Sequence, residues 1–219
     1  MKIFLDTANI DDIKTWSNTG IIDGVTTNPT HMSTADGDPK SVINEIMKIM
    51  PNGEISIETT EKDPKAVYEQ AKKIAGLGPN ILVKIPCTRE YYPIIGDLVK
   101  EGVKLNITLV FSLMQGLFMS KLGVTYISPF IGRLNDIDND GLGLLYELKQ
   151  MQEDYGFETG ILAASLRTVD HLHGTIEAGV DVATLPVSIL EKTTTHPLTD
   201  AGIAAFDTDW KKLGIKQFP

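Results

Sequence analysis

Short apolar runs alternate with longer segments of helical periodicity along the whole chain. A brief apolar run between polar residues predicts a buried strand, and apolar residues at intervals of three and four predict an amphipathic helix. The predicted strands lie at 3–5, 24–26, 55–57, 81–83, 103–108, 124–127, 159–163 and 182–184. Predicted helices cover about 9–18, 39–49, 63–74, 90–100, 112–122 and 140–154, and two more begin after Arg167 and near Pro186. The stretch between the second strand and Pro39, rich in Thr, Asp, Gly and Pro, predicts a loop.

This order gives about eight strand-then-helix units in succession. Repeated units of this kind predict a parallel sheet, and eight of them predict an α/β protein with a closed (β/α)8 TIM barrel. A further helix is expected at about 198–213, and no linker divides the chain, so we expect a single domain over 1–219. A glycine-rich Gly-x-Gly-x-x-Gly turn does not follow any predicted strand, which counts against a dinucleotide-binding fold.

Polar residues follow the apolar runs at the points where the predicted strands end. In a barrel of this type these ends meet at one face, where binding and catalysis take place. We therefore expect these side chains to converge on one mouth. They are Asp6, Thr26, Thr27, Asn28, Glu58, Lys84, Asn106, Thr108, Ser128, Arg133, Ser165 and Arg167.

Lys84 is the most informative of these residues because it lies inside an apolar segment, after Ile-Leu-Val and before Ile-Pro. Burying a lysine is costly unless it has a partner or a role. Burial and nearby cations lower the pKa of an amine, and the neutral amine attacks a ketone to give an iminium, an electron sink for carbon–carbon cleavage. The structural alternative, of about equal weight, is a strand-end lysine paired with Asp6 or Glu58.

Asp6 and Glu58 form a candidate acid–base pair beside this lysine. Formation of an imine and carbon–carbon cleavage each need proton transfer, and two carboxylates take different roles where their environments differ. The alternative, which position alone slightly favours for either residue, is that they only neutralise Lys84.

Arg133, Ser165 and Arg167 have the character of an anion site. Guanidinium groups hold phosphate oxygens through paired, charge-assisted hydrogen bonds, so two arginines at the mouth of an acidic protein favour a phosphorylated substrate. The alternative is that each arginine pairs with one of the 29 acidic residues.

Thr26, Asn28, Asn106 and Ser128 are candidates for hydrogen bonds to the hydroxyls of a polyol. From residue type alone, capping and turn formation are the better explanation for each of them, because these side chains commonly bond to nearby backbone.

Composition narrows the possible partners. A net charge of −9 disfavours attraction to nucleic acid or to an anionic membrane surface. No apolar run reaches the length of a membrane span and no signal-peptide core follows the N-terminus, so we expect a cytoplasmic protein. The one cysteine, Cys87, is interpreted as a packing residue, and the four histidines lack metal-ligand spacing, so we expect no metal.

Six segments, in order along nearly the whole chain, resemble the transaldolase family, and the length resembles its short branch. They are Phe4–Ala8, Gly24–Pro29, Val83–Pro86, Leu105–Ser112, Ser128–Arg133 and Ala163–Arg167. The family transfers a dihydroxyacetone unit between phosphorylated sugars: sedoheptulose 7-phosphate and glyceraldehyde 3-phosphate give erythrose 4-phosphate and fructose 6-phosphate, in the pentose phosphate pathway. The resemblance implies no metal or organic cofactor.

The resemblance also implies roles for single residues. Lys84 matches the Schiff-base lysine, and Asp6 matches the carboxylate that moves protons to and from substrate hydroxyls. Glu58 and Thr108 match the pair that holds a catalytic water. The implied contacts to the dihydroxyacetone part come from Asn28, Asn106 and Ser128, and those to the phosphate come from Arg133, Ser165 and Arg167.

A similar branch, fructose 6-phosphate aldolase, releases free dihydroxyacetone and is the alternative function. That branch tends to carry glutamine at the position of Glu58 and tyrosine at that of Phe130, so both residues favour a transaldolase. The sequence departs from the family at Thr30-His31-Met32, where a small polar residue and an aliphatic one are usual, and at Cys87, usually aliphatic. A catalytically silent barrel is a third hypothesis, disfavoured by the intact Lys84.

Short members of the family resemble one another in forming pentamers that pair as decamers, often with the C-terminal helix on a neighbour. Phe206 and Trp210, four residues apart, give the last predicted helix an apolar stripe for such a contact. The alternative is that this stripe packs on its own barrel. We expect a homo-oligomer.

Overall fold

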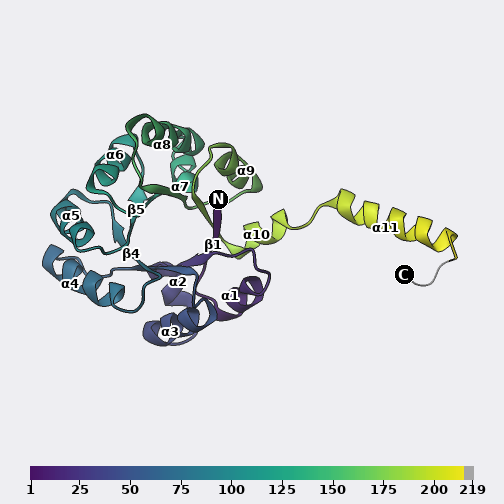
Figure 1. Cartoon of the computed structure of the whole chain (residues 1–219), viewed down its shortest axis with the longest axis horizontal. Coiled ribbons are helices and arrows are strands. Elements are labelled where there is room, and N and C mark those ends of the chain that lie inside the picture. The colour runs from purple at the N-terminus through teal and green to yellow at the C-terminus, as the bar shows by residue number, and fades with distance from the viewer. Residues whose placement is uncertain (215–219) are drawn as a thin grey trace.

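Eight parallel strands form a closed barrel in sequence order, with helices around it (Figure 1). The computed structural model describes residues 1–214; the final positions of the expected domain, 215–219, lie outside this range. Pairing of Lys2–Leu5 with Val182–Leu185 closes the ring, which confirms the predicted (β/α)8 barrel. The strands are β1 (Lys2–Asp6), β2 (Gly24–Thr26), β3 (Glu54–Glu58), β4 (Ile81–Pro86), β5 (Leu105–Val110), β6 (Tyr126–Pro129), β7 (Gly160–Ala163) and β8 (Val182–Leu185).

The surrounding helices begin at side-chain caps that the sequence supplies. Asn9 accepts hydrogen bonds from the backbone of Asp11 and Asp12, and Asp38 and Asp63 cap helices that open with proline. These helices are α1 (Ile10–Ser17), α3 (Pro39–Ile49), α4 (Pro64–Ala75), α5 (Tyr92–Lys100, after a 3-10 turn at Arg89–Tyr91), α6 (Leu113–Leu122), α8 (Gly141–Tyr155), α9 (Val169–Glu177) and α10 (Val187–Thr193).

Two short helices, α2 (Pro29–Thr34) and α7 (Ile131–Asn135), were missed by the periodicity analysis. The expectation of a loop between the second strand and Pro39 is therefore wrong for 29–34. Helix α2 has no buried residue, so no apolar stripe marks it in the sequence. Asn28 starts it instead, by accepting a hydrogen bond from the backbone of His31 at 2.9 Å.

Two strands lie two residues later than their apolar runs predicted. β5 starts at Leu105 rather than at Val103, and β6 starts at Tyr126 rather than at Val124. Val124 is buried and Val103 packs against the core, but both precede the paired segment. At these positions apolar character predicted burial correctly, but it did not predict which residues form the strand. The shift leaves Thr108 inside β5, whose register becomes irregular between Ile107 and Val110.

The C-terminal helix α11 (Pro197–Lys212) is present and extends away from the barrel (Figure 1). It has no buried residue, and Leu198, Ile203 and Phe206 are 75%, 61% and 78% exposed. The alternative in which the stripe of Phe206 and Trp210 packs on its own barrel is therefore not realised for Phe206. Within residues 1–214, no helix has both the length and the apolar character needed to cross a bilayer.

Candidate active site

Alternation along the strands decides which side chains point into the barrel. Phe4 and Leu82 belong to an interior apolar cluster with Tyr126, Leu162 and Val182. Residues two positions later on a strand point to the same face, so Asp6 follows Phe4 into the barrel and Lys84 follows Leu82. The interior therefore changes from an apolar layer to a polar layer toward the C-terminal ends of the strands.

A cavity of about 160 Å³ occupies this polar layer and brings together most of the predicted site residues; of those expected at the mouth, Thr27, Glu58 and Thr108 do not line it. Its predicted members are Asp6, Thr26, Asn28, Lys84, Asn106, Ser128, Phe130, Arg133, Ser165 and Arg167. Glu58 lines a neighbouring apolar cavity of about 430 Å³, and Thr108 lines neither. Nine of the twelve strand-end residues thus line one cavity, and Phe130, which came from the family resemblance, lines it too.

Lys84 is 5% exposed and is held by the neighbouring strand β3 and by the residue that follows β2. Its Nζ lies 3.1 Å from Glu58 Oε2 and donates to the Thr27 carbonyl oxygen at 3.2 Å. The register of β3 and β4 sets Glu58 directly opposite Lys84. The structural alternative, an ion pair with Glu58, is therefore present; it also places a carboxylate within proton-transfer distance of the amine.

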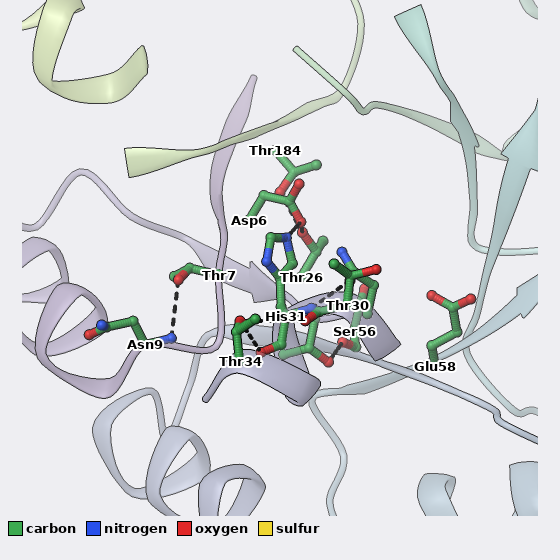
Figure 2. A network of polar contacts seen from close by, with 12 residues as sticks. Asp6, Thr7, Asn9, Thr26, Thr30, His31, Thr34, Ser56, Glu58 and Thr184 are labelled. Carbon is green, nitrogen blue, oxygen red and sulfur yellow. Dashed lines mark hydrogen bonds and ion pairs between the residues drawn. The ribbon is translucent and has the colours of Figure 1, made fainter. Parts of the chain in front are cut away.

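Asp6 is held through one of its two oxygens (Figure 2). Thr26 Oγ1 donates to Asp6 Oδ1 at 3.0 Å, and His31 Nε2 lies 3.2 Å from the same oxygen. Burial alone would raise the pKa of Asp6, but the hydrogen bond and charge of His31, with smaller contributions from Lys84 and Thr26, outweigh it and lower that pKa. Asp6 is therefore a carboxylate over a wide pH range.

A chain of buried hydrogen bonds crosses the floor of the cavity. Ser128 Oγ donates to Asn106 Oδ1 at 2.6 Å, and Asn106 Nδ2 donates to Ser56 Oγ at 3.1 Å. The chain fixes the orientation of the Asn106 amide and uses its oxygen as an acceptor. Thr108 is also buried, and within residues 1–214 its Oγ1 has no hydrogen-bond partner.

The two arginines differ in their surroundings. Arg133 lies over the Phe130 ring, with Cζ 5.0 Å from the ring centroid. Arg167 forms an exposed ion pair with Asp136, which is the alternative that the acidic composition suggested. Gly132 permits this arrangement, because a Cβ there would collide with the Ser165 carbonyl oxygen and come within 2.8 Å of Arg167 Nε. Ser165 itself has a positive φ of 58°.

Sequence reasoning missed several residues at this mouth. Thr184 is the last residue of the predicted strand 182–184, lines the cavity, and has its Oγ1 2.5 Å from Thr26 Oγ1, so the strand-end rule was sufficient to find it. His171 accepts a hydrogen bond from the Arg167 backbone at 3.2 Å, and burial together with the Arg167 charge lowers its pKa. Its partner, the Arg167 backbone, lies in a loop, and no sequence pattern predicts this hydrogen bond.

Metal-binding chemistry has no candidate group here: within residues 1–214, no three His, Cys, Asp or Glu side chains are arranged to hold an ion. Cys87 lies in the core, where burial raises the pKa of its thiol despite a contact from the Tyr92 hydroxyl at 4.0 Å. This position agrees with a packing role.

The fold and the site define a class: a (β/α)8 barrel with a buried lysine, two carboxylates and two arginines at the C-terminal ends of its strands. The chain belongs to the transaldolase/fructose-6-phosphate aldolase family, whose match covers residues 3–217. It is thus a member of a family of transferases and aldolases.

Relatives described as "Probable transaldolase" match over nearly the full length of both chains. The protein of Lactiplantibacillus plantarum is 47% identical over 99% of this chain and 100% of its own. That of Dehalococcoides mccartyi is 44% identical over 97% of this chain and 99% of its own. Among solved structures, a mutant flavocytochrome b2 with pyruvate bound has a TM-score of 0.60 at 12% identity, covering 84% of this chain and 56% of that one. That likeness shows the fold alone.

Proposed function

We propose that this chain is a transaldolase that moves a dihydroxyacetone unit from a ketose phosphate to an aldose phosphate through a Schiff base on Lys84. The expected reaction converts sedoheptulose 7-phosphate and glyceraldehyde 3-phosphate into erythrose 4-phosphate and fructose 6-phosphate, in the pentose phosphate pathway. The observation that carries the proposal is the buried Lys84 amine in a polar cavity, 3.1 Å from Glu58 Oε2.

In the first step, the neutral Lys84 amine attacks the C2 ketone of the donor and the carbinolamine loses water to give an iminium. Glu58 is close enough to take the proton that leaves the amine. A water held between Glu58 and Thr108 would return a proton to the departing hydroxyl. The buried Thr108 hydroxyl supports this role, because leaving it unsatisfied costs about 1–3 kcal/mol.

In the second step, the iminium accepts the electron pair of the C3–C4 bond. Asp6 takes the proton of the C4 hydroxyl as that oxygen becomes the carbonyl of the leaving aldehyde, and an enamine stays on Lys84. An incoming aldehyde reverses these changes: the enamine forms the new bond, and Asp6 returns the proton to the aldehyde oxygen. Hydrolysis then frees the ketose and the amine.

The other cavity residues would hold the donor. Thr26, Asn28, Asn106 and Ser128, which line the cavity, would bind hydroxyls of the dihydroxyacetone part. Arg133, Ser165 and Arg167 would bind the phosphate, which has to compete with Asp136 for Arg167. An exposed ion pair contributes about 0–1 kcal/mol, whereas a charge-assisted hydrogen bond contributes about 1.5–3 kcal/mol. The phosphate is therefore the stronger partner.

Fructose 6-phosphate aldolase activity is the competing proposal. Phe130 favours the transferase, since its ring lines the cavity between Phe111, at 5.9 Å between centroids, and Arg133, without offering a hydroxyl. A tyrosine there would add a proton donor that helps water discharge the enamine. We assign the chain no metal or organic cofactor, because the lysine supplies the electron sink itself.

Borohydride trapping followed by product analysis tests this proposal. Reduction in the presence of fructose 6-phosphate should add one dihydroxyacetone-derived mass to the Lys84 peptide and to no other. Without an acceptor, free dihydroxyacetone should not accumulate; with erythrose 4-phosphate, sedoheptulose 7-phosphate should form. The absence of an adduct would reject imine chemistry, and acceptor-independent release of dihydroxyacetone would favour the aldolase.

We also propose a cytoplasmic homo-oligomer, a pentamer or decamer, in which α11 contacts a neighbouring copy. The exposed Leu198, Ile203 and Phe206 on a helix that extends from the barrel support this. Replacing Ile203 and Phe206 by glutamate should reduce the assembly to smaller species, as measured by light scattering after size-exclusion chromatography. Thr208→Glu, two residues from Phe206 and so on another side of the helix, should not. An unchanged mass for the double variant would contradict the role of α11.

A further inference from the structure

His31 is brought to the active-site mouth by the short helix α2. Asn28 caps this helix, and the cap fixes the His31 backbone directly after β2. The imidazole then reaches Asp6, with Nε2 3.2 Å from Oδ1 (Figure 2). The side chains of His31 and Asp6 are 31% and 22% exposed, so the contact is partly shielded from solvent.

The contact gives the two oxygens of Asp6 different surroundings. Oδ1 receives both Thr26 Oγ1 and His31 Nε2. Within residues 1–214, no group hydrogen-bonds Oδ2. A carboxylate held by one oxygen cannot turn freely, so its other oxygen keeps one direction. Asp6 lines the cavity that contains Lys84, which makes Oδ2 the atom available to a donor hydroxyl.

His31 also lines a second, polar cavity. The outer cavity has a volume of about 350 Å³ and is lined by Thr7, Asn9, Asp11, His31, Thr34 and Asp36. In Figure 2 the imidazole points toward the Asp6 carboxylate, and Thr7 and Asn9 lie to the left of the ring. The titratable groups around the ring are thus Asp6 on β1, with Lys84 of β4 beyond it, and Asp11 and Asp36 along the outer cavity.

We propose that His31 is a positioning residue for Asp6, which fixes Oδ1 so that Oδ2 faces the donor. The proposal rests on the proposed function, in which Asp6 accepts the C4 hydroxyl proton. Its chemistry is simple: a base has to be deprotonated and correctly oriented before cleavage. An aliphatic side chain at this position would offer neither a hydrogen bond nor a charge.

The direction of the pH effect follows from the surroundings of Asp6. Burial raises the pKa of this carboxyl, and His31 is the largest contribution that lowers it. Without His31 the pKa of Asp6 rises, so the fraction of ionised Asp6 falls at mildly acidic pH. The acid limb of the kcat/KM profile therefore moves to higher pH.

Two variants and one matched control test the proposal. His31→Leu removes the hydrogen bond and the charge, and His31→Gln keeps an amide donor without the charge. His173→Leu, on an exposed helix position with its side chain 71% accessible, is the control. In His31→Leu we expect about a tenfold loss of kcat/KM at pH 7 and an acid limb that moves to higher pH. His31→Gln should recover part of the activity.

A measurement of Asp6 itself separates this proposal from the proposed function. The carboxyl carbon of labelled Asp6, followed by NMR titration, should show a raised pKa in His31→Leu and no change in His173→Leu. The Lys84 adduct with borohydride should form in every variant, because imine formation does not use His31. An Asp6 titration and a kcat/KM profile that match the unsubstituted protein would overturn the role of His31. Loss of activity with an unmoved acid limb would also overturn it. A missing adduct in the unsubstituted protein would instead reject the proposed function.

Discussion

Replacing Lys84 by methionine should lower kcat by a factor on the order of 10⁴ or more and abolish the borohydride adduct. Methionine keeps the length and the burial of the side chain and removes the amine that would form the imine. Without a covalent electron sink, cleavage has to place a negative charge on carbon, and a covalent nucleophile is a residue whose removal costs several orders of magnitude. Initial rates with fructose 6-phosphate and erythrose 4-phosphate measure this loss.

The same variant tests the structural alternative, because Lys84 is also the ion-pair partner of Glu58. Removing one member of a buried pair costs about 3–5 kcal/mol of stability, so Lys84→Met should unfold more easily. Adding Glu58→Gln should restore part of the stability and none of the activity. Lys2 forms a more exposed ion pair with Glu54, at 3.0 Å, and both residues lie at the N-terminal ends of their strands, away from the cavity. Lys2→Met is therefore the control and should keep its turnover; turnover by Lys84→Met would show that the lysine is structural.

The barrel and its mouth were predictable because they depend on local pattern. Short apolar runs located the strands, and the residue after each run marked its C-terminal end. Alternation along a strand then placed Asp6 above Phe4 and Lys84 above Leu82. Strand positions, strand ends and alternation depend only on residues that are close in sequence, and for this reason they could be predicted without the structure.

The partners of these residues were not predictable in the same way. Asp136 binds Arg167 across 31 positions of sequence, and His31 reaches Asp6 through a helix too polar to show periodicity. The start of β5 was wrong because Val103 packs against the core without joining the sheet. Strand pairing and side-chain partners depend on distant residues, whereas apolar character reports only burial. The departure from the family at His31 was visible in the sequence, but its contact with Asp6 was not.

Replacing Asp6 by asparagine should lower kcat/KM by about 10²–10⁴ while leaving the Lys84 adduct intact, the range for a lost general base. Asparagine has nearly the same shape and still accepts a hydrogen bond from Thr26, so the pocket should be preserved. It does not take the C4 hydroxyl proton. The iminium should therefore form and fail to cleave, and the trapped adduct should retain the full sugar rather than the three-carbon fragment. Mass spectrometry of the Lys84 peptide distinguishes the two.

The stability of this variant should also change with pH in a defined direction. The pKa of Asp6 is lowered in the folded protein, so its ionised form stabilises the fold above the unfolded pKa, and this contribution is lost as pH falls through the folded value. Asp6→Asn removes that contribution. Its free energy of unfolding should be reduced at pH 7 and should depend less on pH in the acid range, as measured by urea denaturation.

Asp23→Asn is a suitable control, because Asp23 accepts a backbone hydrogen bond from Ile3 at 2.8 Å just before β2 and lies outside the cavity. This variant should keep its turnover, and the adduct trapped on Lys84 should be the three-carbon fragment, as in the unsubstituted protein. If Asp6→Asn also trapped only that fragment at an undiminished rate, another group would have to accept the C4 proton. In the proposed mechanism Lys84 and Glu58 exchange a proton during imine formation, so Asp6 is the carboxylate left for the cleavage step.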